Sequence, residues 1–205
     1  MVGALQRVLP EDVILTLDSG VHHNWFMQFW QARRPQSMLN SWGYSSMGFG
    51  VCSALGAQLA APERPVVSVC GDGGFTMTPY VLCTAVEYDI PVVWVIWNNF
   101  AWGAIRDIQF GMFDAREIGT AFYRGQTGER YNPDFAAWAR ACGADGVTVT
   151  RPGDLAGAVE TAVRNRRPCV IDVHVDAEVR PPSTGTWQLP PTPYREPAFG
   201  KPFVA

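Results

Sequence analysis

A run of six consecutive apolar residues, 92–97, limits the folds open to this chain more than any other feature. A strand with one face in water alternates apolar and polar side chains, whereas an unbroken run is typical of a strand covered on both faces. The expected strands are residues 13–17, 66–70, 92–97, 147–150 and 169–175, and the expected helices between them are residues 47–60, 79–88, 133–142 and 154–165. This alternation predicts a doubly wound α/β domain with a mainly parallel sheet and helices on both faces.

Three of the expected helices have recognisable starts. Thr78-Pro79 offers a hydroxyl cap followed by a proline in the first turn, and Asn132-Pro133 and Gly153-Asp154 are similar signals. These signals predict that the second, third and fourth helices begin close to those residues.

The length of 205 residues suits one well-packed domain and is too short for two large ones. We expect that domain to occupy residues 1–176. Residues 111–130 are glycine-rich and charged without a clear period, which predicts a functional or mobile loop. Residues 177–205 carry seven of the sixteen prolines, which predicts an extended tail on a surface of this chain or of a partner.

Composition disfavours several classes of protein. The net charge is -3 and there is no basic run, so nucleic acid is not an expected partner. No apolar stretch reaches the roughly 18 residues of a membrane span, and residues 1–10 lack a signal-peptide pattern. The five cysteines are scattered, four of them in apolar surroundings, which predicts buried free thiols and a reducing, cytoplasmic location.

Polar residues follow two of the expected strands. Asp72 lies in Gly71-Asp72-Gly73-Gly74, and Asn99 follows it 27 residues later, after a helix and a strand. Because the carboxyl ends of parallel strands meet at one edge of a sheet, the two side chains can come together there. Magnesium prefers oxygen ligands and often bridges protein groups to phosphates, so the spacing predicts a metal-bridged diphosphate.

Other interpretations of this motif exist. Gly-Asp-Gly alone is more often a tight turn, and only its combination with the spacing, helix and strand favours a cation site. A phosphate-binding loop of the Gly-x-x-x-x-Gly-Lys-Ser/Thr type is absent from the sequence. Gly48-x-Gly50 is an incomplete dinucleotide pattern, so a nucleotide-binding protein of flavodoxin or dinucleotide type stays a weak alternative.

The motif from Asp72 to Asn99 resembles that of the thiamine diphosphate-dependent enzymes. Further segments look like the acetolactate synthase group of that family. These segments are Asp18-Ser-Gly-Val-His-His-Asn-Trp25, Leu39-Asn-Ser-Trp-Gly-Tyr-Ser-Ser-Met-Gly-Phe-Gly50, Ala54-Leu-Gly-Ala-Gln58 and Ile90-Pro-Val. The resemblance covers roughly residues 9–176 and implies the diphosphate-binding domain of that family.

The resemblance also assigns roles to individual residues. It implies magnesium ligands, a cradle for the diphosphate, contacts to the aminopyrimidine ring and a border to the substrate. The implied metal ligands are Asp72, Asn99 and the Ala101 carbonyl, and the implied diphosphate contacts are Gly73, Gly74 and His22. The implied aminopyrimidine contacts are Ser45 and Met47, and Met47 also bends the cofactor. The implied substrate border is Trp102, Ile105 and Ile108.

Each of the less specific roles has an ordinary alternative. His22 or His23 can be a half-exposed histidine without function, and Met47 can be core filler. Trp102 can be a packing or interface residue. Arg106 can clamp a substrate carboxylate, although an exposed helical arginine is the commoner case.

The chain departs from the family pattern in three respects. Val51-Cys52-Ser53 replaces a common Pro-Ala-Ala, and Val21 precedes His22 where glutamine is common. The family's enzymes are longer, and a preceding pyrimidine-binding domain supplies the glutamate that activates the cofactor. Here Glu11, Glu63 and Glu87 fit capping or solvated positions, so no catalytic residue is expected in this chain.

The resemblance therefore implies one subunit of a split enzyme. Its partner would be a pyrimidine-binding chain, in a hetero-oligomer such as a dimer of heterodimers, and its substrate a small 2-oxo acid. Decarboxylation followed by carboligation is the expected reaction. The alternatives are a 2-oxo acid decarboxylase without carboligation and a non-catalytic cofactor-binding or regulatory subunit.

Overall fold

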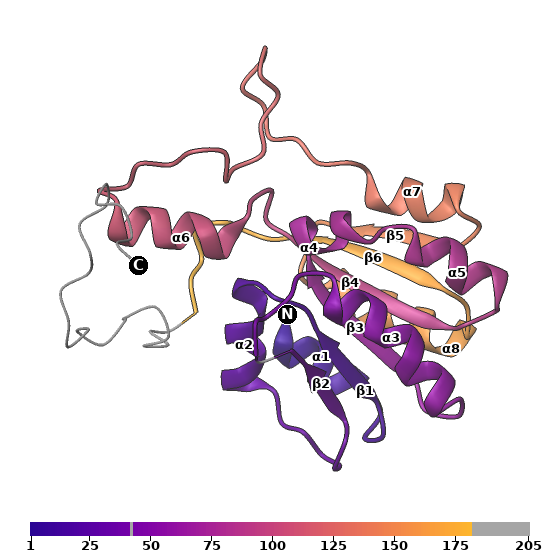
Figure 1. Ribbon diagram of the computed structural model, residues 1–205. Coiled ribbons are helices and arrows are strands. Elements are labelled where there is room, and N and C mark those ends of the chain that lie inside the picture. The colour runs from indigo at the N-terminus through magenta and orange to yellow at the C-terminus, as the bar shows by residue number, and fades with distance from the viewer. Residues whose placement is uncertain (42, 182–205) are drawn as a thin grey trace, which may run out of the picture.

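The computed structural model describes residues 1–41 and 43–181, and its centre is a six-stranded sheet (Figure 1). All pairings in the sheet are parallel, and the strand order is β2-β1-β3-β4-β6-β5. The strands are β1 Ile14–Leu17, β2 Met38–Asn40, β3 Val66–Gly71, β4 Val92–Asn98, β5 Asp145–Val149 and β6 Cys169–His174. The predicted α/β class is confirmed. Among the strands only β2, a three-residue, half-buried edge strand, was not predicted. The helices Val2–Val8, Val21–Phe29, Asp72–Met77 and Gly103–Met112 were not among the helices expected from the sequence pattern either.

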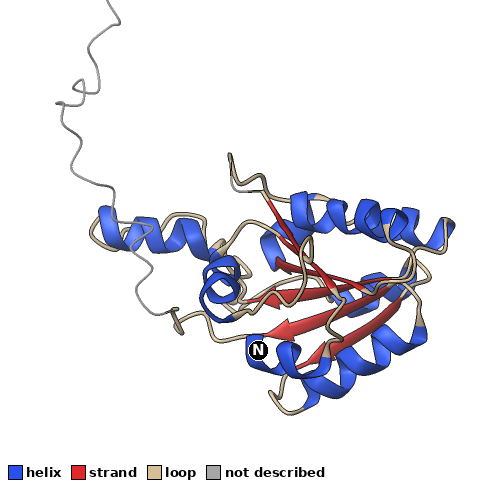
Figure 2. Cartoon of the chain, turned by 90° about the horizontal axis from the view of Figure 1, so that it is seen from below, coloured by secondary structure: helices blue, strands red, loops and turns tan. Residues whose placement is uncertain are grey.

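Helices cover both faces of the sheet (Figure 2). They are α1 Val2–Val8, α2 Val21–Phe29, α3 Phe49–Ala60, α4 Asp72–Met77, α5 Val81–Glu87, α6 Gly103–Met112, α7 Phe135–Ala141 and α8 Asp154–Asn165. One apolar cluster joins α1, α2 and α8 to the sheet, and a second joins α3, α5 and α7 to its other face. In β3, Val67 and Val69 enter the first cluster while Val66 and Cys70 enter the second. This two-sided burial explains why the strands show no polar alternation.

The helix starts differ in part from those expected. Helix α8 begins at Asp154 with Gly153 before it, as predicted. Helix α7 begins at Phe135 and is capped by Asp134, whose carboxylate accepts a 2.8 Å hydrogen bond from Ala137 N, so Asn132 is not its cap. Helix α5 begins at Val81, and the buried Thr78 hydroxyl caps nothing. Asn132 is instead free for a contact described below.

The cysteines were predicted to be mostly buried, and this was wrong. All five are free thiols, but only Cys70 and Cys169 are buried, in β3 and β6. Cys52 and Cys83 are exposed on helices, and Cys142 is half-exposed at the end of α7.

Between α6 and α7 the chain leaves the body of the domain. Residues 113–134 contain only isolated bridges, Ala101–Ala121 and Tyr123–Arg130, and Figure 1 shows α6 and this segment extending away from the sheet. The expectation of a long loop at 111–130 holds except that α6 continues to Met112. Most of the proline-rich tail, residues 182–205, lies outside the described residues. No helix of the described part is long and apolar enough to cross a membrane.

The first turn of α3 packs directly on the end of β1. Asp18, just after β1 and 1% exposed, accepts hydrogen bonds from Gly48 N at 3.1 Å and Gly50 N at 3.0 Å. The Gly50 carbonyl in turn accepts from Thr16 Oγ1 and Ser68 Oγ. A Cβ on Gly50 would lie 2.4 Å from Asp18 N. This close packing holds residues 43–48 next to the carboxyl ends of the strands.

We predict that Gly50→Ala destabilises the protein by about 3 kcal/mol or more, because backbone rather than a movable side chain occupies the space its methyl group needs. Gly56→Ala is the matched control in the same helix: nothing lies within 4 Å of its Cβ position. It should stabilise by about 0.5–1 kcal/mol through helix propensity. Urea unfolding of both variants measures the difference, and equal effects would contradict this packing.

Candidate metal and diphosphate site

The carboxyl ends of β3 and β4 bring together the polar residues of the sequence motif. The two strands pair with Gly71 opposite Trp97. Asp72 is the first residue of α4, directly after β3, and Asn99 follows β4. Both side chains are almost fully buried, at 1% and 6% exposure. The parallel pairing thus places a carboxyl group and an amide beside each other, 27 residues apart in sequence.

Three oxygen atoms converge at this point. Asn99 Oδ1 lies 3.2 Å from Asp72 Oδ1 and 2.9 Å from the Ala101 carbonyl oxygen. No hydrogen lies between these oxygens, so the arrangement is repulsive by itself. Adjacent ligands of an octahedral magnesium ion, with bonds of about 2.1 Å, lie about 3.0 Å apart. The two distances from Asn99 Oδ1 therefore match those between adjacent ligands of a magnesium ion.

A bound cation would relieve the repulsion between these oxygens, and so would reversal of the Asn99 amide. Turned over, its nitrogen would donate hydrogen bonds to Asp72 Oδ1 and to the Ala101 carbonyl. An amide oxygen and nitrogen are distinguished by the partners they face. We therefore expect the turned amide in the metal-free protein, and the three-oxygen arrangement when a cation is bound.

The backbone between Asn99 and Ala101 has an unusual conformation. Phe100 has a φ of 57°, a left-handed conformation that few residues other than glycine adopt. It turns the chain so that Ala101 N donates a 3.2 Å hydrogen bond to Asp72 Oδ2. Left-handed residues of this kind are often found where a site requires one particular backbone direction.

Asn132 is a further hydrogen-bond donor to Asp72, a contact that was not predicted from the sequence. Its Nδ2 donates to Asp72 Oδ2 and to Asn98 Oδ1, both at 2.7 Å. Asn98 Nδ2 donates in turn to Asp172 at 2.9 Å. Asn132 lies 60 positions from Asp72 and before a proline, which suggested a helix start. No local pattern indicates this contact, because the intervening loop returns the chain to the sheet.

Burial decides the protonation of Asp72. It raises the pKa of this carboxyl to about 6, against the opposing effect of hydrogen bonds from Asn132 and from the backbone of Gly73 and Ala101. At neutral pH the group is therefore an ionised carboxylate, and none of its hydrogen-bond donors carries a positive charge. A divalent cation at Oδ1 would supply that charge.

Gly73 and Gly74 lie where side chains have no room. A Cβ on Gly73 would lie 2.4 Å from the Trp102 ring, and one on Gly74 would lie 2.2 Å from Asp18 Oδ2. The two glycines thus serve the packing of the first turn of α4, in addition to any role of their backbone amides toward an anion.

His22 lines the same cavity but is not half-exposed, so that alternative was wrong. The ring is 1% exposed, and its Nε2 lies 2.9 Å from the Asp18 carbonyl oxygen. Burial above all, and then His23, lowers the pKa of His22 to about 3. In the neutral ring Nε2 donates to the carbonyl and Nδ1 is an acceptor, so contact with a phosphate requires a second proton on Nδ1. His23 is also buried, at 8% exposure.

Met47 and Ser45 lie on the loop before α3. Met47 is half-buried and lines the cavity, and its Cε lies 4.0 Å from the Cβ position of Gly74. It belongs to neither of the two apolar clusters, which argues against core filler. Ser45 has a φ of 51°, and its hydroxyl donates to Ser19 Oγ at 3.0 Å. Ser45 is not among the residues that line the cavity.

The residues expected to border a substrate divide into two groups. Trp102 and Ile105 line the cavity, with Ile105 51% exposed, whereas the half-buried Ile108 does not. The Trp102 ring also packs edge-on against Phe122 at 5.6 Å. The expectation of an exposed Arg106 was wrong: its side chain is only 14% exposed and pairs with Glu117 at 3.3 Å and Glu178 at 3.0 Å. Its alternative role toward a substrate carboxylate stays a prediction.

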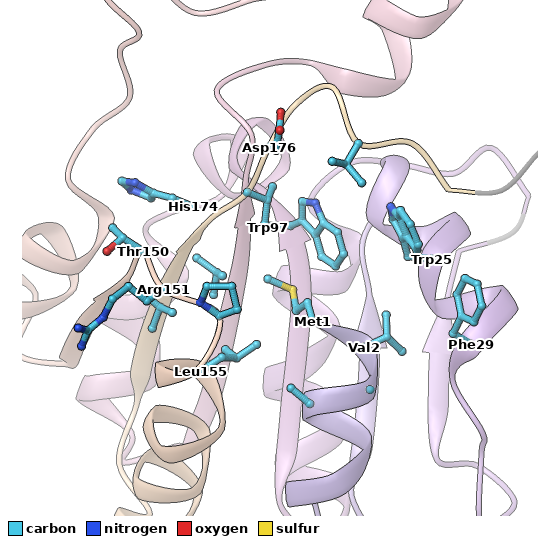
Figure 3. A pocket seen from close by; sticks show the side chains of 17 residues that line it. Met1, Val2, Trp25, Phe29, Trp97, Thr150, Arg151, Leu155, His174 and Asp176 are labelled. Carbon is cyan, nitrogen blue, oxygen red and sulfur yellow. The ribbon is translucent and has the colours of Figure 1, made fainter.

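The cavity at Asp72 is small. It measures about 80 Å³, whereas a pocket for a whole ligand usually measures about 300–1,000 Å³. It can hold one end of a cofactor, and no glutamate is among its lining residues. A cavity of about 700 Å³ lies on the other side of Trp97, between α1, α2 and the end of β5 (Figure 3). That larger cavity contains none of the converging oxygens, so the small one is the candidate site.

Comparisons with known proteins show which family this chain resembles. A family model described as "Thiamine pyrophosphate enzyme, C-terminal TPP binding domain" matches residues 18–173. The chain is 35% identical over 185 residues to the putative thiamine pyrophosphate-containing protein YdaP of Bacillus subtilis, covering 90% of this chain and 30% of that protein. It is 37% identical to the acetolactate synthase large subunit of Parasynechococcus marenigrum, covering 82% and 26%. It is 31% identical to the sulfoacetaldehyde acetyltransferase of Castellaniella defragrans, covering 87% and 29%.

The chain thus spans less than a third of the length of these relatives. The matched residues run from the end of β1 to the end of β6 and include the whole Asp72 site. This chain belongs to the thiamine pyrophosphate enzyme family, as a C-terminal TPP-binding domain homologous to that of acetolactate synthase large subunits.

Proposed function

We propose that this chain is the diphosphate-binding part of a thiamine diphosphate- and magnesium-dependent enzyme that acts on small 2-oxo acids. The observation that carries the proposal is the convergence of Asp72 Oδ1, Asn99 Oδ1 and the Ala101 carbonyl at the edge of the sheet. Two neutral oxygens and one carboxylate suit a hard cation that also binds phosphate.

Each part of the site has one task in this proposal. Asp72, Asn99 and Ala101 hold magnesium, which binds the diphosphate, while the backbone amides of Gly73 and Gly74 approach the phosphate oxygens. Asn132 keeps Asp72 Oδ2 occupied, so that Oδ1 stays directed at the metal. Met47 and the loop of Ser45 border the rest of the cofactor. When bound, thiamine diphosphate supplies the carbanion chemistry that cleaves a 2-oxo acid next to its carbonyl group.

A pyrimidine-binding chain completes the site in this proposal. The 80 Å³ cavity accommodates one end of a cofactor, and no glutamate in the described residues lines it. The activating carboxylate and the other wall therefore come from outside these residues. We place them on a partner subunit, in a hetero-oligomer such as a dimer of heterodimers, with Ile105 exposed toward the substrate.

We favour carboligation over simple decarboxylation. Two of the relatives are named as a synthase of acetolactate and as an acetyltransferase, names that describe the joining or transfer of a carbon unit. The residues that would anchor the cofactor serve either reaction, so this choice rests on the relatives alone.

Replacement of the charged Asp72 side chain by a neutral amide is expected to raise the stability of the metal-free protein and to weaken metal binding. In Asp72→Asn the new oxygen can keep the hydrogen bonds from Ala101 and Asn132, and the new amide can donate to Asn99 Oδ1. The variant should stabilise the metal-free protein at pH 7–8 by up to about 3 kcal/mol, the cost of a pKa raised from 3.8 to about 6. It should also lose magnesium-dependent binding of thiamine diphosphate. Urea unfolding and calorimetry measure the two effects.

The matched control for this exchange is Asp154→Asn, at the exposed start of α8. It should leave both the unfolding free energy at pH 7–8 and cofactor binding close to those of the unchanged protein. Unaltered cofactor binding by Asp72→Asn would contradict the proposed site.

The titration of Asp72 is expected to respond to magnesium. Since its pKa is raised above the unfolded value, the stability from this carboxyl is fully present below pH 4 and is lost as the pH rises through 6. Carboxyl ¹³C NMR of the metal-free protein should show a midpoint of about 6 that disappears in Asp72→Asn. Saturating magnesium and thiamine diphosphate should lower this midpoint by at least one unit. A midpoint near 4 without cofactor would show that the site is not electrostatically prepared for a cation.

The proposed reaction is tested by reconstitution. We expect no measurable conversion of pyruvate by this chain alone with cofactor and magnesium. Activity should appear with a pyrimidine-binding chain, and disappear when Asp72→Asn replaces the unchanged protein. A product in which the decarboxylated unit is joined to a second carbonyl compound would indicate carboligation, whereas a free aldehyde would indicate simple decarboxylation. Full activity of the isolated chain would contradict the need for a partner.

A further inference from the structure

Two thiols lie next to each other on the surface of the domain, away from Asp72. Cys83 is on α5 and Cys142 directly follows α7, and their Sγ atoms are 3.9 Å apart although 59 positions separate them in sequence. Cys83 is exposed and Cys142 half-exposed, so a small oxidant can reach the pair. Neither residue lines the candidate site.

The packing of the two helices fixes this proximity. Leu82 and Ala85 of α5 share an apolar cluster with Phe135 and Ala139 of α7. Just after Cys142, Gly143 has a φ of 90°, and a Cβ on it would lie 3.3 Å from Val86 Cγ1. The backbone just after α7 therefore lies against α5, and the two thiols lie where these segments meet.

A disulfide requires only a small change from this arrangement. The bond length is about 2.05 Å, so the sulfur atoms must approach by about 1.9 Å, a distance within reach of side-chain rotation. Because the segment just after α7 already lies against α5, neither helix needs to move far for this step. The other cysteines differ: Cys70 and Cys169 are buried, and burial raises the pKa of Cys70 and raises that of Cys169 to about 12.

We infer that Cys83 and Cys142 are a modification site that forms a reversible intramolecular disulfide with a peroxide as oxidant. The exposed Cys83 attacks hydrogen peroxide as the thiolate: the S–O bond forms and the O–O bond breaks, giving a sulfenic acid. The hydroxide that leaves takes up the proton lost by the thiol and becomes water. The Cys142 sulfur then attacks the sulfenic sulfur, the S–S bond forms, and a second water leaves. The two thiols lose two electrons and two protons in total, and the peroxide gains both.

The order of the two steps follows from the surroundings of the thiols. Burial first, and then the neighbouring Cys83, raise the pKa of Cys142, which disfavours its thiolate. Cys83 is the more exposed of the two thiols, so a peroxide reaches it first, and Cys142 reacts second, once the sulfenic acid lies beside it. The order in which the two thiols react does not depend on the proposed catalytic function.

The bond would join α5 and α7 around a large part of the domain. The closed ring contains β4, Asn99, α6 and the long loop to Asn132. Restricting a ring of this length in the unfolded chain favours the folded state. Oxidation would therefore hold α7, and the Asn132 segment before it, more firmly to the sheet.

The test is peptide mapping of the full chain after treatment with one equivalent of hydrogen peroxide under native conditions. We expect a monomer in which one cross-linked peptide pair joins Cys83 to Cys142, and reversal of the link by dithiothreitol. The thermal midpoint should rise by about 5–10 °C on oxidation. Cys52→Ser, which removes a separate exposed thiol, should behave in the same way.

Two results would overturn the inference. One is separate oxidation of Cys83 and Cys142 without a link between them. The other is an unchanged cross-linked peptide yield in a protein unfolded before oxidation, since the folded contact would then contribute nothing. In Cys83→Ser both the link and the rise in thermal midpoint should be absent, and a remaining rise would also contradict the assignment.

Discussion

A buried carboxylate without a compensating charge governs the architecture at the carboxyl edge of this sheet. Asp72 follows β3 directly, so the β3–β4 pairing decides that its neighbours are Asn99 and Ala101. Their oxygens face one another at 2.9 and 3.2 Å, a repulsion that a cation or an amide reversal removes. Two nearby donors occupy the other carboxylate oxygen: the left-handed Phe100 brings Ala101 N to Asp72 Oδ2, and Asn132 Nδ2 donates to the same atom.

This arrangement implies a balance between stability and binding. Ionised Asp72 is costly in the metal-free protein, because burial raises its pKa to about 6. The same desolvation strengthens the attraction to a bound cation, since fewer water molecules compete with it. A site of this kind is destabilising until it is filled.

Patterns of short range predicted most of the fold and part of the site. The five apolar runs became strands because apolar clusters cover both faces of the sheet, and the Asp72–Asn99 spacing reports the adjacency of two parallel strands. What the sequence did not indicate depends on contacts across long loops or on burial. Asn132 reaches Asp72 only after the chain returns from residues 113–131, and Arg106 is covered because two distant glutamates pair with it. β2 is too short to show a period.

The most direct test of the metal site is anomalous diffraction from crystals grown with manganese and thiamine diphosphate. We predict one anomalous peak about 2.2 Å from each of Asp72 Oδ1, Asn99 Oδ1 and the Ala101 carbonyl oxygen, with the Asn132 amide still on Asp72 Oδ2. The account would be contradicted by a cofactor bound without a peak there, with the Asn99 amide turned so that its nitrogen donates to Asp72.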